Sequence, residues 1–127
     1  MKKKNYKKYE LIFNEGTYGN SAYMIDFGKV GIISNTNQSG QRKLLATLKK
    51  DDIFGEMGLI DNKVRAATAF ALEDTQVSVI SKKTFDYLLK HDPIALKPLL
   101  KVLTHRLRNT TNLLQEYIRR PLLDINQ

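Results

Sequence analysis

Apolar and polar positions alternate in short runs over residues 9–80, and turn residues separate these runs. The runs are rich in β-branched and aromatic residues, which favour strands. The predicted strands are residues 9–13, 22–26, 29–33, 42–48, 66–72 and 76–80. Many short strands at this spacing are typical of antiparallel sheets that pack as a sandwich or roll.

The segments between the strands contain residues that turns require. Residues 14–21 form a polar loop with two glycines, and Gly28 separates two strands at an expected tight turn or bulge. Residues 49–64 follow neither a strand nor a helix period. We therefore expect an irregular connector within the β region.

The hydrophobic period changes from two to about 3.6 residues at Ser81, which fits a helix N-cap. Phe85, Leu88 and Leu89 share one face of this predicted helix, which should stop near residues 91–93. The body of the chain is thus followed by a helical region.

A second, longer helix is expected to open at Asp92 and Pro93, a cap followed by proline in the first turn. Pro121 should end it within one or two residues. Its apolar positions are Leu99, Val102, Leu103, Leu107, Leu114, Tyr117 and Ile118. This apolar stripe could pack on the β body or pair two chains.

The 127 residues suffice for one hydrophobic core and are too few for two. Hydrophobic residues make up 42% and charged residues 27% of the chain, and no apolar run is long enough to cross a bilayer. Cysteine is absent, which excludes disulfides and thiolate metal sites and suits a reducing compartment. Because no apolar stretch follows the first lysines to form a secretory signal, we expect a cytoplasmic protein without a membrane span.

The net charge of +8 is concentrated at the N-terminus. Five lysines lie within residues 1–8 with no acid between them, so the other 119 residues carry only about +3. We interpret residues 1–8 as a solvated basic leader and residues 9–127 as the folded domain. The alternative is that the leader contacts membrane phosphates, nucleic acid or an acidic partner.

The connector at residues 52–69 carries the candidate chemistry. Gly55 and Glu56 precede a very short apolar segment, and Arg65 stands beside two alanines where a strand begins. Such a connector can turn several backbone N–H groups toward one small volume. The planar guanidinium of Arg65 matches phosphate oxygens, whereas Glu56 would repel a phosphate and has to serve a neutral hydroxyl. A ribose phosphate carries both groups.

Two stretches of this connector, Phe54-Gly55-Glu56 and Arg65-Ala66-Ala67-Thr68, resemble the phosphate-binding cassette of the cyclic nucleotide-binding domain family. That family includes the bacterial catabolite activators, the regulatory subunits of cAMP-dependent protein kinase and cyclic nucleotide-gated channels. Eight residues separate Glu56 from Arg65, the same interval as in the kinase subunits. Residues 13–16 and 23–30 are similar to the family's opening strand, loop and returning strand, so the similarity covers roughly residues 9–115.

The resemblance implies a mainly β fold, a double-stranded β-helix or jelly-roll-like β-roll, with a short cassette helix and two C-terminal helices. It also implies the binding roles. Arg65 would pair with the exocyclic oxygens of the cyclic phosphate, the Ala66 N–H would donate to the same group, and Ala67 would belong to the same site. Glu56 would accept from the ribose 2′-hydroxyl, and Gly55 would let the backbone approach the sugar.

Simpler interpretations of two cassette residues stay open. Arg65 could be a surface residue paired with Asp61 or Glu56, and Glu56 could be a carboxylate at a helix start without a ligand. The candidates for contact with the purine base are the apolar residues Leu45, Phe54 and Val64. We expect only one or two such apolar side chains to touch the base, and the others to belong to the core.

The last helix, at about residues 93–120, resembles the lid and dimer helix of the catabolite activators. Thr110 and Thr111 fall where a pair of hydroxyl residues of that helix meets the adenine, one of them across a dimer, and Leu107 is a further candidate for the base or the lid. This makes a homodimer through the helix one expectation. Alternatively, the two threonines are ordinary residues on a solvated helix face.

Three positions depart from the family pattern. Asp51 stands where a glycine usually precedes Asp52, and Val64 stands where many members have proline. Ala66 follows the arginine where cGMP-responsive and several bacterial members carry a hydroxyl residue. The missing hydroxyl removes one bond to the guanine amino group, which favours cAMP over cGMP.

The sequence therefore predicts a non-catalytic regulatory module that binds a cyclic nucleotide, preferably cAMP, and transmits binding through its C-terminal helix. One alternative is a nucleotide-independent β-roll for interaction or oligomerisation, and another is the sensory half of a transcription regulator without its DNA-binding part. The few residues after Pro121 cannot form a helix-turn-helix, so we expect no sequence-specific DNA binding by this chain alone.

An enzyme is not expected. His91 and His105 both fall in the helical region, and no nucleophile and base occur at convincing spacing. We therefore predict no catalytic residue, no metal and no cofactor.

Overall fold

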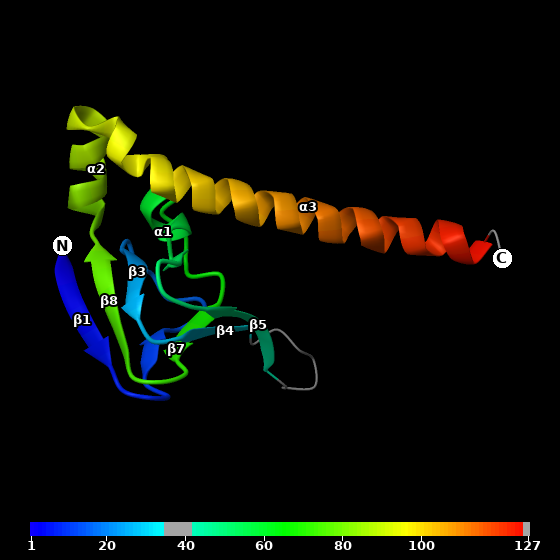
Figure 1. Cartoon of the computed structure of the whole chain (residues 1–127), viewed down its shortest axis with the longest axis horizontal. Coiled ribbons are helices and arrows are strands. Elements are labelled where there is room, and N and C mark those ends of the chain that lie inside the picture. Colours follow the sequence, from blue (N-terminus) through cyan, green and yellow to red (C-terminus); the bar gives the residue numbers. More distant parts are fainter. Residues whose placement is uncertain (35–41, 126–127) are drawn as a thin grey trace. The chain divides into compact units, whose positions relative to one another are not determined.

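The computed structural model describes residues 1–34 and 42–125, and the chain divides into two compact units at residues 91 and 92. The first unit contains two four-stranded antiparallel sheets (Figure 1). One sheet has the order β1 (Lys2–Tyr6), β8 (Thr75–Ile80), β3 (Ala22–Phe27) and β6 (Ile53–Phe54). The other has the order β2 (Leu11–Phe13), β7 (Thr68–Ala71), β4 (Val30–Ser34) and β5 (Lys43–Leu48). The predicted β-roll is confirmed.

Both sheets contribute to one hydrophobic core. Along β3, Tyr23 and Ile25 are buried while Met24 and Asp26 are partly exposed, as the two-residue period of a strand requires. The buried cluster consists of Tyr23, Ile25, Val30, Phe54, Ala69 and Val77. Sequence alternation identified these strands because each buries one face.

The strand β1 was not predicted, since we interpreted residues 1–8 as a solvated leader. Its lysines are indeed exposed, but its backbone pairs with β8 from Lys2 opposite Val79 to Tyr6 opposite Thr75. A strand at the edge of a sheet needs only one neighbour and tolerates charged side chains on both faces. The sequence did not predict this strand, because its lysine run has no alternation of apolar and polar residues.

Two helices belong to the first unit. The short helix α1 (Met57–Ile60) lies within the irregular connector, and α2 (Lys82–His91) follows β8. Ser81 caps α2 as predicted, because its Oγ accepts a hydrogen bond of 3.1 Å from the Thr84 N–H. Of the predicted apolar face, Phe85 is buried and Leu89 is exposed.

The second unit contains the 3-10 helix η1 (Pro93–Leu96) and the long helix α3 (Lys97–Ile125). The prediction that Pro121 ends this helix is wrong, since α3 continues to Ile125. Proline removes one backbone donor and crowds the preceding turn, and a helix can continue past it at that cost. No helix in the described ranges combines the length and the apolar character that a bilayer crossing needs.

Candidate functional site

The connector between β6 and β7 is built on a backbone turn at Gly55. β6 pairs with β3 through Tyr23 opposite Phe54, and Gly55 then adopts a φ of +73°, in the left-handed region that favours glycine. A Cβ at Gly55 would also lie 3.0 Å from Nη1 of Arg65. The backbone conformation therefore favours the glycine that the sequence singled out, and an added Cβ would crowd the Arg65 guanidinium.

Arg65 is buried rather than exposed at the surface, with only 5% of its surface accessible. The loop between β2 and β3 holds its backbone: the Arg65 N–H donates to the Thr17 carbonyl and the Arg65 carbonyl accepts from the Gly16 N–H, both at 2.8 Å. Its guanidinium donates from Nη1 to the Gly55 carbonyl and from Nη2 to the Ser21 carbonyl, each at 2.8 Å. Backbone atoms far apart in the sequence thus fix both ends of this residue.

An aromatic cluster lies beside the guanidinium. The Arg65 Cζ lies 4.4 Å from the ring centroid of Phe13 and 5.8 Å from that of Tyr23. The Phe54 ring lies 6.0 Å from Phe13 and 5.2 Å from Tyr23 between centroids. The negative ring faces attract the cation and orient its plane.

The Nε of Arg65 is the one buried side-chain polar atom within the described chain that has no hydrogen-bond partner. A buried donor without a partner costs about 1–3 kcal/mol, so such groups are rare unless a ligand or water completes them. The guanidinium has five N–H donors in a planar fork that matches phosphate oxygens. The arrangement therefore leaves the Nε donor of a buried cation without an acceptor oxygen in the described chain.

Glu56 follows Gly55 and stands at the start of α1. It is 2% exposed, and its side chain makes no capping hydrogen bond to this helix within the described residues. A carboxylate this deeply buried is costly unless it interacts with polar or charged groups. Glu56 therefore stands at the helix start without capping it through its side chain.

The other predicted site residues differ in burial and in the unit of the chain to which they belong. Ala66 is exposed and Ala67 is half-buried, between Arg65 and β7. Phe54 belongs to the buried aromatic cluster, whereas Leu45 and Val64 are exposed. Leu107, Thr110 and Thr111 are exposed on α3 in the second unit. The first unit thus brings Gly55 into direct contact with Arg65 and places Phe54 in the aromatic cluster beside the guanidinium.

Sequence reasoning missed four residues that surround Arg65. Phe13 and Tyr23 contribute rings, Ser21 contributes its carbonyl, and Gly19 lies against the guanidinium. The two glycines of the loop at residues 14–21 were the available signal, but they indicated only a turn. Within residues 1–34 and 42–125 no group of three potential metal ligands occurs.

Comparison with known proteins agrees with this geometry. The sequence profile of the cyclic nucleotide-binding domain matches residues 3–92. A cyclic AMP receptor protein of Thermus thermophilus is 34% identical over 103 residues, which cover 81% of this chain and 47% of that protein. The crystal structure of the Thermus thermophilus catabolite activator protein has a TM-score of 0.81 at 32% identity, over 90% of this chain and 53% of the other.

Other similar proteins are named for different nucleotides. The human cGMP-dependent protein kinase 2 is 37% identical over 82 residues, 64% of this chain and 11% of the kinase. The EAL enzyme Bd1971 in its cAMP-bound form has a TM-score of 0.65 at 33% identity, over 87% of this chain and 29% of the enzyme chain. The chain spans about half the length of the Thermus relative, which it matches at 47%. Because the family profile covers most of the chain, this protein belongs to the cyclic nucleotide-binding domain family.

Proposed function

We propose that this chain is a non-catalytic regulatory module that binds a cyclic mononucleotide and prefers cAMP. The observation that carries the proposal is the buried Arg65 guanidinium, whose Nε donor has no partner within the described residues. A cyclic phosphate offers the oxygens that this donor needs, and charge-assisted bonds to a guanidinium are stronger than bonds between neutral groups. The relatives named for cAMP and cGMP support the same ligand class.

The other cassette residues would complete the ligand's contacts. The Ala66 N–H would donate to the phosphate beside Arg65, Ala67 would line the same site, and Glu56 would accept from the ribose 2′-hydroxyl. Gly55 would bring its backbone close to the sugar without a side chain in the way. The lack of a hydroxyl at Ala66 supports the preference for cAMP.

Base contacts and signal transmission belong to the proposal as well. Leu107, Thr110 and Thr111 lie on α3, and the proposed signal is a repositioning of this helix when nucleotide binds. The free energy for such a change can come only from tighter binding of the nucleotide by one of the two states. A ligand with equal affinity for both states would shift nothing.

Isothermal titration with cAMP and with cGMP tests the proposal. We expect saturable binding, tighter for cAMP, and a loss of roughly 10- to 100-fold in Arg65→Ala, because about 1.5–3 kcal/mol is typical of a hydrogen bond to a charged group. Lys63→Ala is the matched control, since it removes one positive charge from an exposed position of the same connector. Its affinity should equal that of the parent protein.

Two outcomes would contradict the proposal. Unchanged cAMP affinity in Arg65→Ala would remove the proposed anchor. A folded parent protein that ignores both nucleotides at millimolar concentration would favour the alternative of a nucleotide-independent interaction module.

A further inference from the structure

Three glycines, Gly19, Gly55 and Gly58, lie close to the guanidinium of Arg65. A Cβ at Gly19 would lie 2.6 Å from Nη2, 2.8 Å from Nε and 3.0 Å from Cζ of Arg65. Real Cβ atoms essentially never approach a neighbour within 3.0 Å. Cβ atoms at Gly55 and Gly58 would each lie 3.0 Å from Nη1. Of the three glycines, Gly19 therefore makes the closest approach to the guanidinium, at its Nη2 and Nε atoms.

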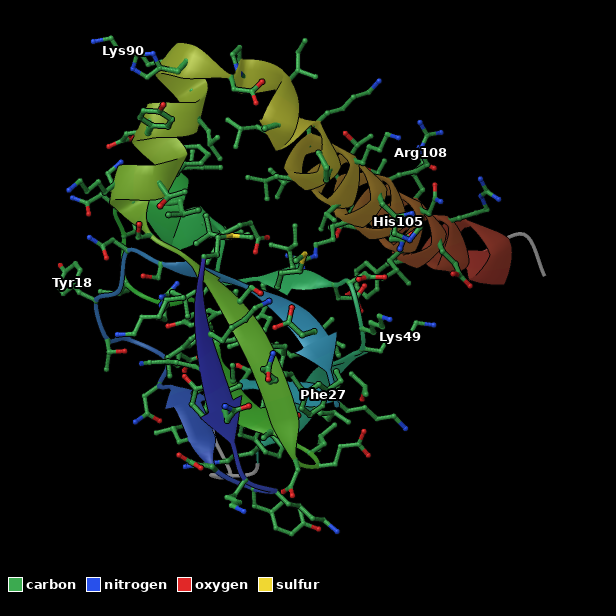
Figure 2. All side chains as sticks on the ribbon, turned by 60° about the vertical axis from the view of Figure 1, so that its left-hand side comes forward. Tyr18, Phe27, Lys49, Lys90, His105 and Arg108 are labelled. Atoms are coloured by element: carbon green, nitrogen blue, oxygen red, sulfur yellow. The ribbon has the colours of Figure 1, made fainter. Side chains whose placement is uncertain are left out.

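Gly19 belongs to the loop that also binds Arg65 by hydrogen bonds. In this loop the Gly16 N–H, the Thr17 carbonyl and the Ser21 carbonyl all contact Arg65. Tyr18 points away from the roll (Figure 2), while the next residue lies against the guanidinium. The loop thus contacts Arg65 along the whole residue, from the Arg65 backbone to the Nη2 atom of its guanidinium.

The requirement for glycine at this position is one of space. Gly19 is not among the residues with positive φ, so an alanine there would not be forced into a left-handed conformation. The atoms that an alanine methyl would meet are the far end of a flexible side chain. The guanidinium, rather than the loop backbone, would therefore move.

We infer that Gly19 is a positioning residue, which lets Arg65 lie where its Nη2 reaches the Ser21 carbonyl while its Nε has no hydrogen-bond partner in the described chain. Its effect on nucleotide affinity rests on the function proposed above. Its effect on the position of Arg65 does not. Displacing the guanidinium breaks hydrogen bonds of 2.8 Å to Gly55 and Ser21 and moves the cation off the Phe13 ring.

Gly58 differs from Gly19 in what an added methyl group would meet. A Cβ at Gly58 would collide with the backbone carbonyl oxygen of Gly19, which cannot move without the loop. Gly58→Ala should therefore destabilise the fold whether or not Arg65 is present. This contrast separates the positioning effect from general crowding.

The first test compares cAMP affinity and thermal stability of Gly19→Ala. We expect the affinity to fall by at least about tenfold, the loss of one charge-assisted hydrogen bond. Ser81→Ala is the stability control, because it removes the cap of α2 and should lower the melting temperature by a few degrees without a change in affinity. Equal affinity losses in the two variants would overturn the inference.

The second test needs no nucleotide. In a double-mutant cycle, Gly19→Ala should lower the melting temperature of the parent protein but not that of Arg65→Ala, where the methyl group finds room. Gly58→Ala should lower it in both backgrounds. In a ¹⁵N–¹H spectrum, the Arg65 Nε–H signal, assigned by its loss in Arg65→Ala, should shift in Gly19→Ala and stay in place in Ser81→Ala.

The outcomes distinguish this inference from the proposed function. Coupling in the cycle, together with a shifted Nε–H signal, supports the positioning role even if the parent protein binds neither nucleotide, which would refute the proposed function alone. Additive effects in the cycle, or an unshifted signal, would refute the positioning role even if cAMP binds.

Discussion

A single buried cation defines the candidate chemistry of this protein. Arg65 is held by two carbonyl oxygens and by the ring of Phe13, so its guanidinium is oriented before any ligand arrives. Preorganisation of this kind lowers the entropy that binding would otherwise cost. The position of Arg65 could be predicted from the cassette pattern. Its acceptors could not, because Gly55 and Ser21 contribute only backbone oxygens.

Ala66 provides a prediction about nucleotide choice. Ala66→Thr should raise the cGMP affinity relative to the cAMP affinity by roughly 3- to 10-fold, since a hydroxyl can bond the guanine amino group and a neutral hydrogen bond contributes about 0.5–1.5 kcal/mol. Ala66→Val is the matched control, because valine has the shape of threonine without the hydroxyl. Titration of both variants with both nucleotides measures the ratio, and an equal change in the two variants would contradict the prediction.

Among the structural elements, the edge strand β1 shows how polar groups attach a segment whose sequence has no alternation of apolar and polar residues. Lys3 Nζ donates to Ser78 Oγ at 2.6 Å and to Asp26 Oδ2 at 3.1 Å. Ser78 Oγ donates to Asp26 Oδ1 at 2.8 Å, and Gln76 Nε2 donates to Asp26 Oδ2 at 3.0 Å. These bonds join β1, β8 and β3 on one face of the sheet.

The pKa of Asp26 makes this network sensitive to acid. Burial acts to raise the pKa, but hydrogen bonds from Gln76, Ser78 and Lys3 and the charge of Lys3 outweigh it and hold the pKa below its ordinary value of 3.8. Because the folded-state pKa is the lower one, the stabilisation is present above pH 3.8 and disappears as the pH falls through the folded-state pKa.

Asp26→Asn should therefore lower the free energy of unfolding by about 1 kcal/mol near neutral pH. The difference from the parent protein should shrink as the pH falls below 3.8. Thermal melts across this pH range measure both effects. Asp86→Asn is the control, because Asp86 forms an exposed pair of 3.5 Å with Lys82 on α2. A pH-independent difference for Asp26→Asn would contradict the argument.

At the scale of the whole molecule, α3 presents an apolar seam that one chain leaves exposed. Leu100, Leu107 and Leu114 recur every seven residues and are 60%, 68% and 57% exposed. Thr110 and Tyr117 occupy the second core position of the same heptads. A sustained seam of this kind on a 29-residue helix is typical of pairing with another helix. We therefore expect two copies of the chain to associate through α3.

Sedimentation velocity of the parent protein and of Leu107→Asp tests this expectation. The parent protein should form a dimer, and the aspartate should dissociate it, because a charge without a partner is costly in an apolar seam. Asn112→Asp places the same charge on the opposite face of α3 and should leave the dimer intact. A parent protein that sediments as a monomer at all concentrations would refute the expectation.

Local patterns in the sequence determined most strands of the roll, the cap of α2 at Ser81 and the cassette around Gly55 and Arg65. Such features depend on neighbouring residues, so alternation, turn residues and motif spacing reveal them. Strand spacing indicated a sandwich or roll of antiparallel sheets, and the cassette helix followed from the family resemblance. The predicted stop at Pro121 was wrong because proline lowers the stability of a helix locally without always ending it.

The tertiary structure alone decided what surrounds Arg65 and where the lysine run lies. Ser21 acts through its carbonyl oxygen, and β1 joins β8 through its backbone. Every residue type carries nearly the same backbone, so contacts of this kind leave no mark in the pattern of side chains. They appear only when the folded chain brings distant segments together.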